Sequence, residues 1–338
     1  MDEMMKAVRL HDFGGPEVLV YEVAPKPVPG PGEVLVRVRA AGVNPPDWYL
    51  REGYRMLPPD WQPKMTFPII PGTDISGVVE AVADDVTGFV AGDEVYAMVR
   101  FPSGLNGDSR GYAQYVAVPA SELAAKPAGI DHVHAAAAPM SLLTAWQFII
   151  EQGHEVPNPL QPHPHVPVPL KGRTVLVNGA GGGVGHLLVQ LARWKGARVI
   201  AVASGKHEGM LRDLGADEFH DYTRTAADEV LRDLDLVVDA VGGPQSRRFL
   251  RTLKPGGALF PVFGLGYDDG GEAGRLGVQV STTQVNSSGA QLAEIAPLLE
   301  DGTIRVVIDS TFPLAEARRA HEHAAKGGLQ GKIVLTVD

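Results

Sequence analysis

The stretch that decides the fold is TVLVNGAGGGVG at residues 174–185, an apolar run that passes into a glycine-rich turn. Helical apolar periodicity follows at once, so the pattern predicts a strand, a tight turn and then a helix. Glycines let the backbone approach phosphate groups, and free N–H groups at a helix start attract anions. The spacing Gly179-x-x-Gly182-x-x-Gly185 is a variant of the G-x-G-x-x-G fingerprint, with Ala180 where the first glycine would be. It predicts a turn that binds the pyrophosphate of a dinucleotide, rather than one that is merely tight.

Strands and helices alternate on the carboxyl side of this turn. Beyond the strand at 174–178, the expected strands are 198–203, 217–220, 236–240 and 257–262, and the expected helices are 184–195, 206–214 and 245–253. This rhythm predicts an α/β fold with a parallel, doubly wound sheet and helices on both faces. The tail adds a helix over 314–326, on which His321 and His323 are expected to face solvent, and a strand over 332–337.

The first third of the chain is different, because short alternating runs of β-branched residues stand between prolines and glycines. The expected strands are 6–10, 18–23, 33–40, 77–82, 94–98 and 112–118, which favour a barrel-like or partly open sheet. The character changes after about Ala135, where one helix is expected over 136–150. The Pro/His-rich stretch 154–169 then predicts an extended surface loop, and its histidines, His154, His163 and His165, are interpreted as solvated rather than as metal ligands.

The end of the strand 198–203 bears on which dinucleotide binds. NAD sites usually place Asp or Glu there to accept hydrogen bonds from the ribose hydroxyls. Here the strand leads into Ser204, Gly205, Lys206 and His207, and the first acid is Glu208. A hydroxyl and a cation suit the 2′-phosphate of NADPH, whereas a carboxylate would repel it. The sequence therefore favours NADPH, with a merely solvated Lys206 as the alternative.

Composition excludes several classes of function. The 338 residues include 30 Lys+Arg and 40 Asp+Glu, a net charge of −10, so no basic excess is available for nucleic acid. The chain has no cysteine, which removes disulfides, iron–sulfur clusters, thiol nucleophiles and cysteine-bound zinc. The apolar stretch 133–150 is interrupted by polar residues and predicts a buried helix rather than a membrane span. Without a signal-peptide pattern, we expect a cytoplasmic protein that does not bind membranes.

A wider set of motifs resembles the medium-chain dehydrogenase/reductase superfamily, in its zinc-independent quinone oxidoreductase branch, over nearly the whole chain. In the first part these motifs are Ala41-Gly-Val-Asn44-Pro-Pro-Asp47, Pro71-Gly-Thr-Asp-Ile-Ser-Gly77, Gly92-Asp-Glu-Val95 and Gly111-Tyr-Ala-Gln-Tyr115. Further on they are Leu143-Thr144-Ala145, the 179–185 turn, Leu214-Gly-Ala-Asp217, Asp221-Tyr222 and Gly331-Lys332-Ile-Val-Leu335. The resemblance implies a GroES-like, β-rich catalytic domain (1–134 and 303–338) and a Rossmann dinucleotide-binding domain (135–302), with the 154–169 loop as an insertion.

The sequence departs from the zinc alcohol dehydrogenases of the same superfamily. Those enzymes hold zinc with a Cys shortly after the Gly-Val pair and with a His-Glu after the Pro-Gly. Here Asn44 stands in the first region and Thr73-Asp74 in the second, and the cysteine-rich structural lobe has no counterpart between Tyr96 and Gly111. We therefore expect no metal in the catalytic site.

The resemblance also implies the site residues. Asn44 is expected near the nicotinamide ribose as an amide N–H donor, and Tyr54 falls where related enoyl reductases carry a tyrosine proton donor, with a partly buried aromatic as the alternative. The expected cofactor-binding residues are Asn44, Thr144, Gly182, Gly183, Val184, Ser204, Lys206, Tyr222, Val241, Gly242, Phe263 and Gly264. Asp239, inside a buried strand, is expected to have a structural role.

These features together predict an NADPH-dependent oxidoreductase that transfers hydride to a quinone or an α,β-unsaturated carbonyl compound. A metal-free aldehyde or ketone reductase and a non-catalytic NADPH-binding protein remain as alternatives. The acceptor pocket is expected to involve residues 48–62 and 265–275, which do not identify the small-molecule substrate. A homodimer is expected from the family alone.

Overall fold

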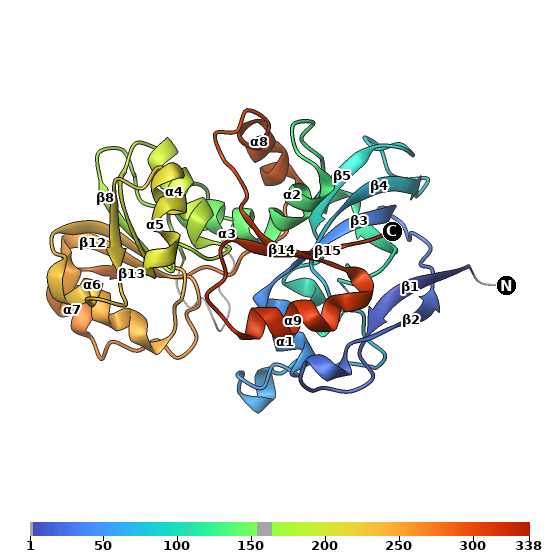
Figure 1. Ribbon diagram of the computed structural model, residues 1–338, viewed down its shortest axis with the longest axis horizontal. Helices are drawn as coiled ribbons and strands as arrows, with labels where there is room; N and C mark the ends of the chain where they lie inside the picture. The colour runs from blue at the N-terminus through green and yellow to red at the C-terminus, as the bar shows by residue number, and fades with distance from the viewer. Residues whose placement is uncertain (1–2, 108, 154–163) are drawn as a thin grey trace.

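The computed structural model describes residues 3–107, 109–153 and 164–338, which form two lobes, each built on its own sheet (Figure 1). The second lobe holds six strands: β8 (Thr174–Asn178), β9 (Arg198–Ala203), β10 (Glu218–Asp221), β11 (Leu234–Asp239), β12 (Leu253–Pro261) and β13 (Gln279–Val280). They lie in the order β10-β9-β8-β11-β12-β13, and every pairing between neighbours is parallel. This is the Rossmann order, which confirms the predicted doubly wound sheet.

Helices cover both faces of this sheet, because successive side chains of a strand point to opposite faces. Val175 and Val177 of β8 pack in one core cluster with leucines of the helix that follows the glycine turn, whereas Leu176 packs with Phe249 in another. The elements around the sheet are α3 (Pro139–Ile149), α4 (Gly185–Trp194), α5 (Glu208–Asp213), α6 (Ala227–Val230), the 3-10 helix η6 (Pro244–Thr252) and α7 (Glu272–Leu276). A further helix, α8 (Gly289–Glu300), packs on α3 and on the strand Leu123–Ala125 of the first lobe.

Five of these elements differ from the sequence prediction, and two of them, the short helices α6 and α7, were not predicted at all. The single helix expected over 136–150 is two helices, α2 (His132–Ala137) and α3, because Pro139 cannot donate the hydrogen bond that would join them. The helix expected over 245–253 is the 3-10 helix η6. Helix α8 was not predicted. Its N-cap residue is Ser288, whose hydroxyl accepts a hydrogen bond from the Gln291 N–H, and serine is one of the residues preferred at the start of helices.

The first lobe is built on a seven-stranded sheet that the end of the chain completes. Its strands are β3 (Glu33–Val43), β4 (Asp74–Val82), β5 (Glu94–Met98), β6 (Tyr115–Pro119), β7 (Leu123–Ala125), β14 (Ile308–Pro313) and β15 (Lys332–Thr336). The order is β14-β15-β3-β4-β5-β7, with β6 also paired to β3. β1 (Met4–Arg9) and β2 (Val20–Pro25) pair separately, and α1 (Pro45–Arg51) and α9 (Ala317–Ala325) pack in the same lobe (Figure 1). The boundaries at 134/135 and 302/303 remain predictions.

Short 3-10 helices connect many of these elements. They are η1 (Pro16–Val18), η2 (Pro59–Trp61), η3 (Ser103–Asn106), η4 (Ala120–Glu122), η5 (Gly205–His207) and η7 (Leu314–Glu316). In the part of the chain that the structure describes, no helix has both the length and the apolar character needed to cross a membrane.

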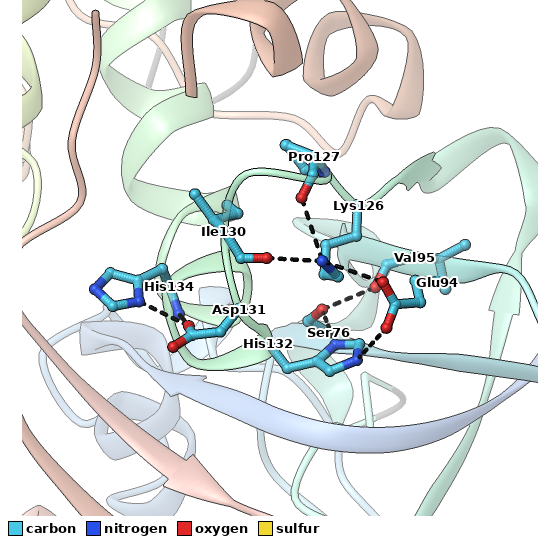
Figure 2. A network of polar contacts seen from close by, with 9 residues as sticks. All are labelled: Ser76, Glu94, Val95, Lys126, Pro127, Ile130, Asp131, His132 and His134. Atoms are coloured by element: carbon cyan, nitrogen blue, oxygen red, sulfur yellow. Dashed lines mark hydrogen bonds and ion pairs between the residues drawn. The ribbon is translucent and has the colours of Figure 1, made fainter. Parts of the chain in front are cut away.

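A polar network fixes the start of α2 to the sheet of the first lobe (Figure 2). The Lys126 ammonium group contacts the Glu94 carboxylate at 3.2 Å and donates to the Ile130 carbonyl at 2.7 Å. Glu94 also contacts His132 at 3.2 Å, and the His132 ring lies 2.8 Å from the Ser76 hydroxyl on β4. The segment that leads into the second lobe is therefore held by side chains of β4 and β5.

Two histidine interpretations are wrong. His321 is 1% exposed rather than solvated, because it lies one helical turn from Ala317 on the buried face of α9. His165 is fully buried beside Phe148, and its ring nitrogens contact Ser281 Oγ and the Phe148 carbonyl, each at 2.9 Å. His323 is partly exposed and contacts Asp309, while His154 and His163 lie outside the described residues.

Candidate functional site

A cleft with a volume of about 270 Å³ is lined by residues from both lobes. Its floor includes the segments that follow β11 and β12, at the carboxyl ends of parallel strands, where ligands of open α/β sheets bind. Seven of the predicted site residues line this one cavity: Asn44, Tyr54, Thr144, Val184, Val241, Phe263 and Gly264.

The remaining predicted cofactor residues lie outside that lining. Gly182 and Gly183 belong to the turn after β8, and Gly242 follows β11. Ser204 follows β9 directly, Lys206 lies two residues further along, and Tyr222 follows β10 and is 57% exposed. They therefore lie beyond the carboxyl ends of four adjacent strands, and their role in binding a cofactor remains a prediction.

The glycine turn has the shape of a phosphate cradle. Gly179 has φ +71°, which an L side chain rarely adopts. A Cβ on Gly185 would lie 2.1 Å from the Gly179 carbonyl oxygen, so the turn could not close there with any other residue. A Cβ on Gly182 would meet no atom of the described residues closer than 3.5 Å, so space is open beside the turn. A dinucleotide pyrophosphate fits this open side at the start of α4.

His186 is hydrogen-bonded to the glycine turn. It is fully buried, and its Nε2 accepts a hydrogen bond from the Val307 N–H at 3.1 Å. Its Nδ1 therefore carries the proton and donates to the Gly182 carbonyl at 2.9 Å. Burial lowers the pKa of His186 to about 4, so the ring is neutral at physiological pH. The neutral tautomer therefore holds the Gly182 carbonyl through a hydrogen bond from its Nδ1–H group.

The groups beside Ser204 are mixed in charge. The Lys206 ammonium group donates to the Gly328 carbonyl at 2.5 Å, across to the loop before β15. Asp221 approaches from the end of β10, since a Cβ on Gly205 would lie 2.7 Å from its carboxylate. Sequence reasoning missed this acid because it considered only the residues directly after β9. Arg224 lies 3.5 Å from the Asp221 carboxylate, so this acid is paired with a cation.

His207 carries a polar atom without a partner next to the glycine turn. The residue is 3% exposed, and its Nδ1 has no hydrogen-bond partner among the described residues. Its ring packs on Gly181, where a Cβ would lie 2.9 Å from that Nδ1. An unsatisfied buried nitrogen beside a phosphate cradle supports the binding of a polar ligand there.

Asn44 is held from three sides in the first lobe. Its side-chain N–H groups donate to the Asp74 carboxylate at 2.9 Å and to Thr73 Oγ1 at 3.3 Å. Its side-chain oxygen accepts a hydrogen bond from the Lys332 ammonium group, which also donates to the Val43 carbonyl at 3.1 Å. Because an ammonium group only donates, these contacts fix which end of the amide faces Lys332. In this arrangement both side-chain N–H groups of Asn44 are bonded within the protein, and its oxygen can accept a second hydrogen bond. Donation from Asn44 to a ligand remains a prediction.

Burial sets the electrostatics of this cluster. Lys332 is 4% exposed and Asp74 is fully buried. Burial lowers the pKa of Lys332, against the opposing effect of the carboxylates of Asp74 and Asp47. Burial likewise raises the pKa of Asp74 to about 6, although Lys332 and the hydrogen bonds from Asn44 and the Met140 N–H favour the carboxylate. Met140 lies at the start of α3, so the broken helix directs the Met140 N–H at Asp74.

A second buried chain of hydrogen bonds converges on Asp47 of α1. Arg51 donates to Nδ1 of His321 at 2.9 Å, which leaves the proton on Nε2 of the imidazole. That Nε2 lies 3.3 Å from the Tyr112 hydroxyl, which donates to the Asp47 carboxylate at 3.0 Å. The Asn44 backbone N–H donates to the same carboxylate oxygen at 2.8 Å. All donors therefore point toward Asp47.

Tyr54 lines the cleft with a phenol group that has no hydrogen-bond partner in the described part of the chain. Its backbone has φ +51°, and its N–H donates to the Tyr49 carbonyl at 2.7 Å. The residue is 5% exposed, and burial together with the nearby Asp47 raises the pKa of the phenol above its ordinary value. The group is therefore protonated at physiological pH and can donate to a ligand in the cleft.

Asp239 has the structural role that the sequence predicted. One carboxylate oxygen accepts hydrogen bonds from the side-chain amide of Asn178 at 2.7 Å and from the N–H groups of Val241 and Gly242, each at 3.1 Å. The other accepts from the Ser246 hydroxyl at 2.6 Å. It thus shapes the turn after β11 that forms part of the cleft.

Sequence reasoning missed much of the apolar lining. Tyr49, Met56, Leu57 and Leu265 come from the two segments expected to shape the pocket. Other lining residues had no motif and belong to segments without a prediction for the site, namely Phe101, Met140, Ser141, Phe148, Thr282, Thr283, Gln284 and Val285. The last group comes from the stretch QVSTTQV at residues 279–285, which carries no motif.

The residues of the first lobe do not fit a catalytic zinc ion. The space facing Asn44 and Asp74 is filled by the Lys332 ammonium group, itself a cation. No set of three or more His, Asp or Glu side chains within the residues described gathers in a way that could hold a metal ion.

Comparison with known proteins places this fold and cleft in a class. Residues 30–128 match the family described as alcohol dehydrogenase GroES-like domain, and residues 214–335 match the family described as zinc-binding dehydrogenase. The chain belongs to the medium-chain dehydrogenase/reductase superfamily.

Particular relatives are similar over most of their length. NAD(P)H oxidoreductase RTN4IP1, mitochondrial, from Mus musculus is 35% identical, with 91% of this chain and 82% of the relative aligned. 2-Methylene-furan-3-one reductase from Solanum lycopersicum is 30% identical (98% and 79%), and quinone oxidoreductase from Homo sapiens is 29% identical (98% and 98%). The solved structure of the quinone oxidoreductase from Coxiella burnetii superposes with a TM-score of 0.82 at 28% identity, covering 99% of this chain and 100% of that one.

Proposed function

We propose that this protein is an NADPH-dependent oxidoreductase of the zinc-independent quinone oxidoreductase branch, which reduces a quinone or an α,β-unsaturated carbonyl compound. One observation carries the proposal: Val184 of the glycine turn, Asn44 and the unpartnered phenol of Tyr54 line a single apolar cleft. The similarity to proteins named quinone oxidoreductase, NAD(P)H oxidoreductase and 2-methylene-furan-3-one reductase supports the same chemistry.

The cofactor would lie along the carboxyl edge of the six-stranded sheet. The backbone at Gly182, Gly183 and Val184 would hold the pyrophosphate, and Ser204, Lys206 and Tyr222 the adenosine end. Thr144, Val241, Gly242, Phe263 and Gly264 would surround the nicotinamide end, where the bound cofactor supplies the hydride. Asn44 would accept a hydrogen bond from the ribose through its side-chain oxygen, because its N–H groups are already bonded to Asp74 and Thr73.

The protein must also stabilise the negative charge that develops on the acceptor oxygen. Tyr54 is suited to this, because the residue lines the cleft and its phenol is protonated and has no competing hydrogen bond in the described residues. The apolar walls, such as Met56, Leu57 and Phe263, exclude water and strengthen that interaction. We propose Tyr54 as the proton donor to the reduced acceptor.

Preference for NADPH over NADH rests on the cations near Ser204. Lys206 lies two residues after Ser204 and bonds only to a neutral carbonyl in the described residues, whereas the Asp221 carboxylate is paired with Arg224 at 3.5 Å. A 2′-phosphate would replace the Gly328 carbonyl as the partner of Lys206, whereas the ribose hydroxyl of NADH offers that lysine no charge.

The test is oxidation of NADPH and of NADH against quinones, enones, enoyl thioesters and aldehydes. We expect turnover with the quinones or enones, and a slower reaction in Tyr54→Phe. Turnover with aldehydes alone would make the protein a carbonyl reductase and the proposal wrong. NADPH binding without any turnover would make it a non-catalytic NADPH-binding protein.

The homodimer and the cytoplasmic location remain predictions. Sedimentation would test the first, and microscopy of the tagged protein would test the second. The RTN4IP1 relatives are named as mitochondrial.

A further inference from the structure

A second and much smaller cavity adjoins the cleft. It has a volume of about 10 Å³ and is lined by Asp47, Thr73, Ser109 and Tyr54 together with apolar side chains. Tyr54, Pro46 and Phe101 line both this cavity and the large cleft, so they separate the two. A cavity of about this size holds one water molecule if two to four polar groups face it.

The polar groups that line the small cavity have unused hydrogen-bonding capacity. Ser109 is 4% exposed, and its Oγ has no partner among the described residues. Asp47 accepts its two hydrogen bonds, from the Asn44 N–H and the Tyr112 hydroxyl, on the single oxygen Oδ2. Its Oδ1 accepts none from the residues described, so this oxygen can carry a proton or bond to water. The phenol of Tyr54 also lacks a partner in that part of the structure.

We propose that one water molecule in this cavity links Oδ1 of Asp47 to the Tyr54 hydroxyl, and that Asp47 returns the proton that Tyr54 gives to the reduced acceptor. This inference rests on the proposed function. The acceptor gains a hydride from the cofactor and a proton from Tyr54. The water then gives a proton to the phenolate oxygen and takes one from the Asp47 carboxyl group. Asp47 regains its proton from solvent, so each turnover consumes one hydride and one solvent proton.

The charges around Asp47 suit this role. Burial raises the pKa of Asp47 to about 7, although the Asn44 N–H and Tyr112 hydroxyl lower it, Asp74 raises it and Lys332 lowers it. The other titratable groups nearby are Tyr54, Arg51 and His321, and burial lowers the pKa of His321 to about 3, so that this ring is neutral. Asp47 is thus partly protonated at neutral pH and is a stronger acid than the Tyr54 phenol, which makes proton return favourable.

The experiment measures kcat for an enone or quinone across pH in the wild type, Asp47→Asn, Tyr54→Phe and the double variant. In the wild type we expect kcat to fall as pH rises above about 7, because Asp47 loses its proton. In Asp47→Asn, kcat should fall about tenfold at neutral pH and lose that dependence, while KM for NADPH stays within about twofold. Adding Asp47→Asn to Tyr54→Phe should change nothing further. Asp84→Asn, at an exposed carboxylate in the turn after β4, is the matched control.

A second pair of variants tests the water without touching Asp47. Ser109→Val fills the small cavity and should lower kcat, whereas Ser109→Ala leaves room for the water and should have a smaller effect. This pair decides the question if Asp47→Asn does not fold. An unchanged pH profile in Asp47→Asn, or equal rates in the two Ser109 variants, would overturn the relay while leaving the proposed function intact. A wild type that reduces neither quinones nor enones would overturn both.

Discussion

Lys332 and Asn44 are 288 residues apart in the chain, and the ammonium group of one donates a hydrogen bond to the side-chain oxygen of the other. The lysine enters from β15, and its side chain also lies against the glycine turn, where a Cβ on Gly183 would be 2.9 Å from Lys332 Cδ. One buried cation therefore contacts both Asn44, which lines the cleft, and the glycine turn. Its charge is opposed by the Asp74 carboxylate, which shares the Asn44 amide.

Replacing Lys332 by methionine tests how strongly this cluster depends on charge. The substitution leaves Asp74 buried without its cation, and we expect the free energy of unfolding to fall by about 3–5 kcal/mol. Urea unfolding at about pH 8 measures the loss. It should be smaller at about pH 5, because the pKa of Asp74 is raised to about 6 and the group is then largely neutral. The double variant Lys332→Met with Asp74→Asn should regain most of the stability; an equally unstable double variant would show that the lysine matters through packing alone.

Gly182→Ala separates binding of the cofactor from folding. A Cβ at Gly182 meets only the Gly179 carbonyl, at 3.5 Å, so we expect the melting temperature to change by no more than about 2 °C. If a pyrophosphate occupies the open side of the turn, the same methyl group should weaken NADPH binding about tenfold or more, measured by fluorescence titration. Gly209→Ala on α5, where a Cβ meets no atom within 4 Å, is the control and should bind NADPH normally.

Lys206→Glu tests the preference for NADPH. A carboxylate in place of the ammonium group would repel a 2′-phosphate, so KM for NADPH should rise by about tenfold or more, and KM for NADH far less. Lys171 is an exposed lysine just before β8, so it lies at the amino ends of the strands, away from the predicted cofactor site. Lys171→Glu should therefore change neither KM value. Equal increases for both cofactors in Lys206→Glu would remove the basis for the assignment.

Asp47→Asn should change the pH dependence of stability. The pKa of Asp47 is raised from 3.8 to about 7, so between these values the folded protein keeps a proton that the unfolded chain has released. The contribution of Asp47 to the free energy of unfolding is therefore largest below about pH 4. This contribution is lost as the pH rises toward 7, because the unfolded chain releases the proton more readily than the folded protein. Relative to the wild type, Asp47→Asn should gain about 2–4 kcal/mol between about pH 4 and about pH 8, as urea unfolding would show. A constant difference across this range would mean that the carboxyl group is not buried in its neutral form.

The sequence predicted the parts of the fold whose signals are local. The strand–turn–helix around residues 174–195 and the strand 198–203 were confirmed, because buried β-branched runs and glycine spacing are read from neighbouring residues. The cleft residues Asn44, Tyr54 and Val184 were also brought together as the family pattern implied. Their roles in binding and catalysis remain proposals.

What the sequence did not predict depends on contacts between distant segments. The sequence placed Lys332 in the family motif at residues 331–335 but did not predict its contacts. Its partners Asn44 and Asp74 come from distant parts of the chain. His321 looked solvated among charged neighbours, yet α9 packs it between Arg51 and Tyr112. Asp221 reaches the end of β9 only because β10 lies beside it in the sheet. No local pattern contains such information, since it is set by which strands become neighbours.

The pairing of β15 with the Ala40–Val43 part of β3 has a consequence for how the protein is made. The six parallel strands of the second lobe lie between residues 174 and 280, so they can assemble while the ribosome is still working. That end of β3 must wait, with one edge open, until residues 332–336 emerge. An unpaired edge strand invites association with other chains, so the first lobe, although synthesised early, is the more exposed to aggregation during translation.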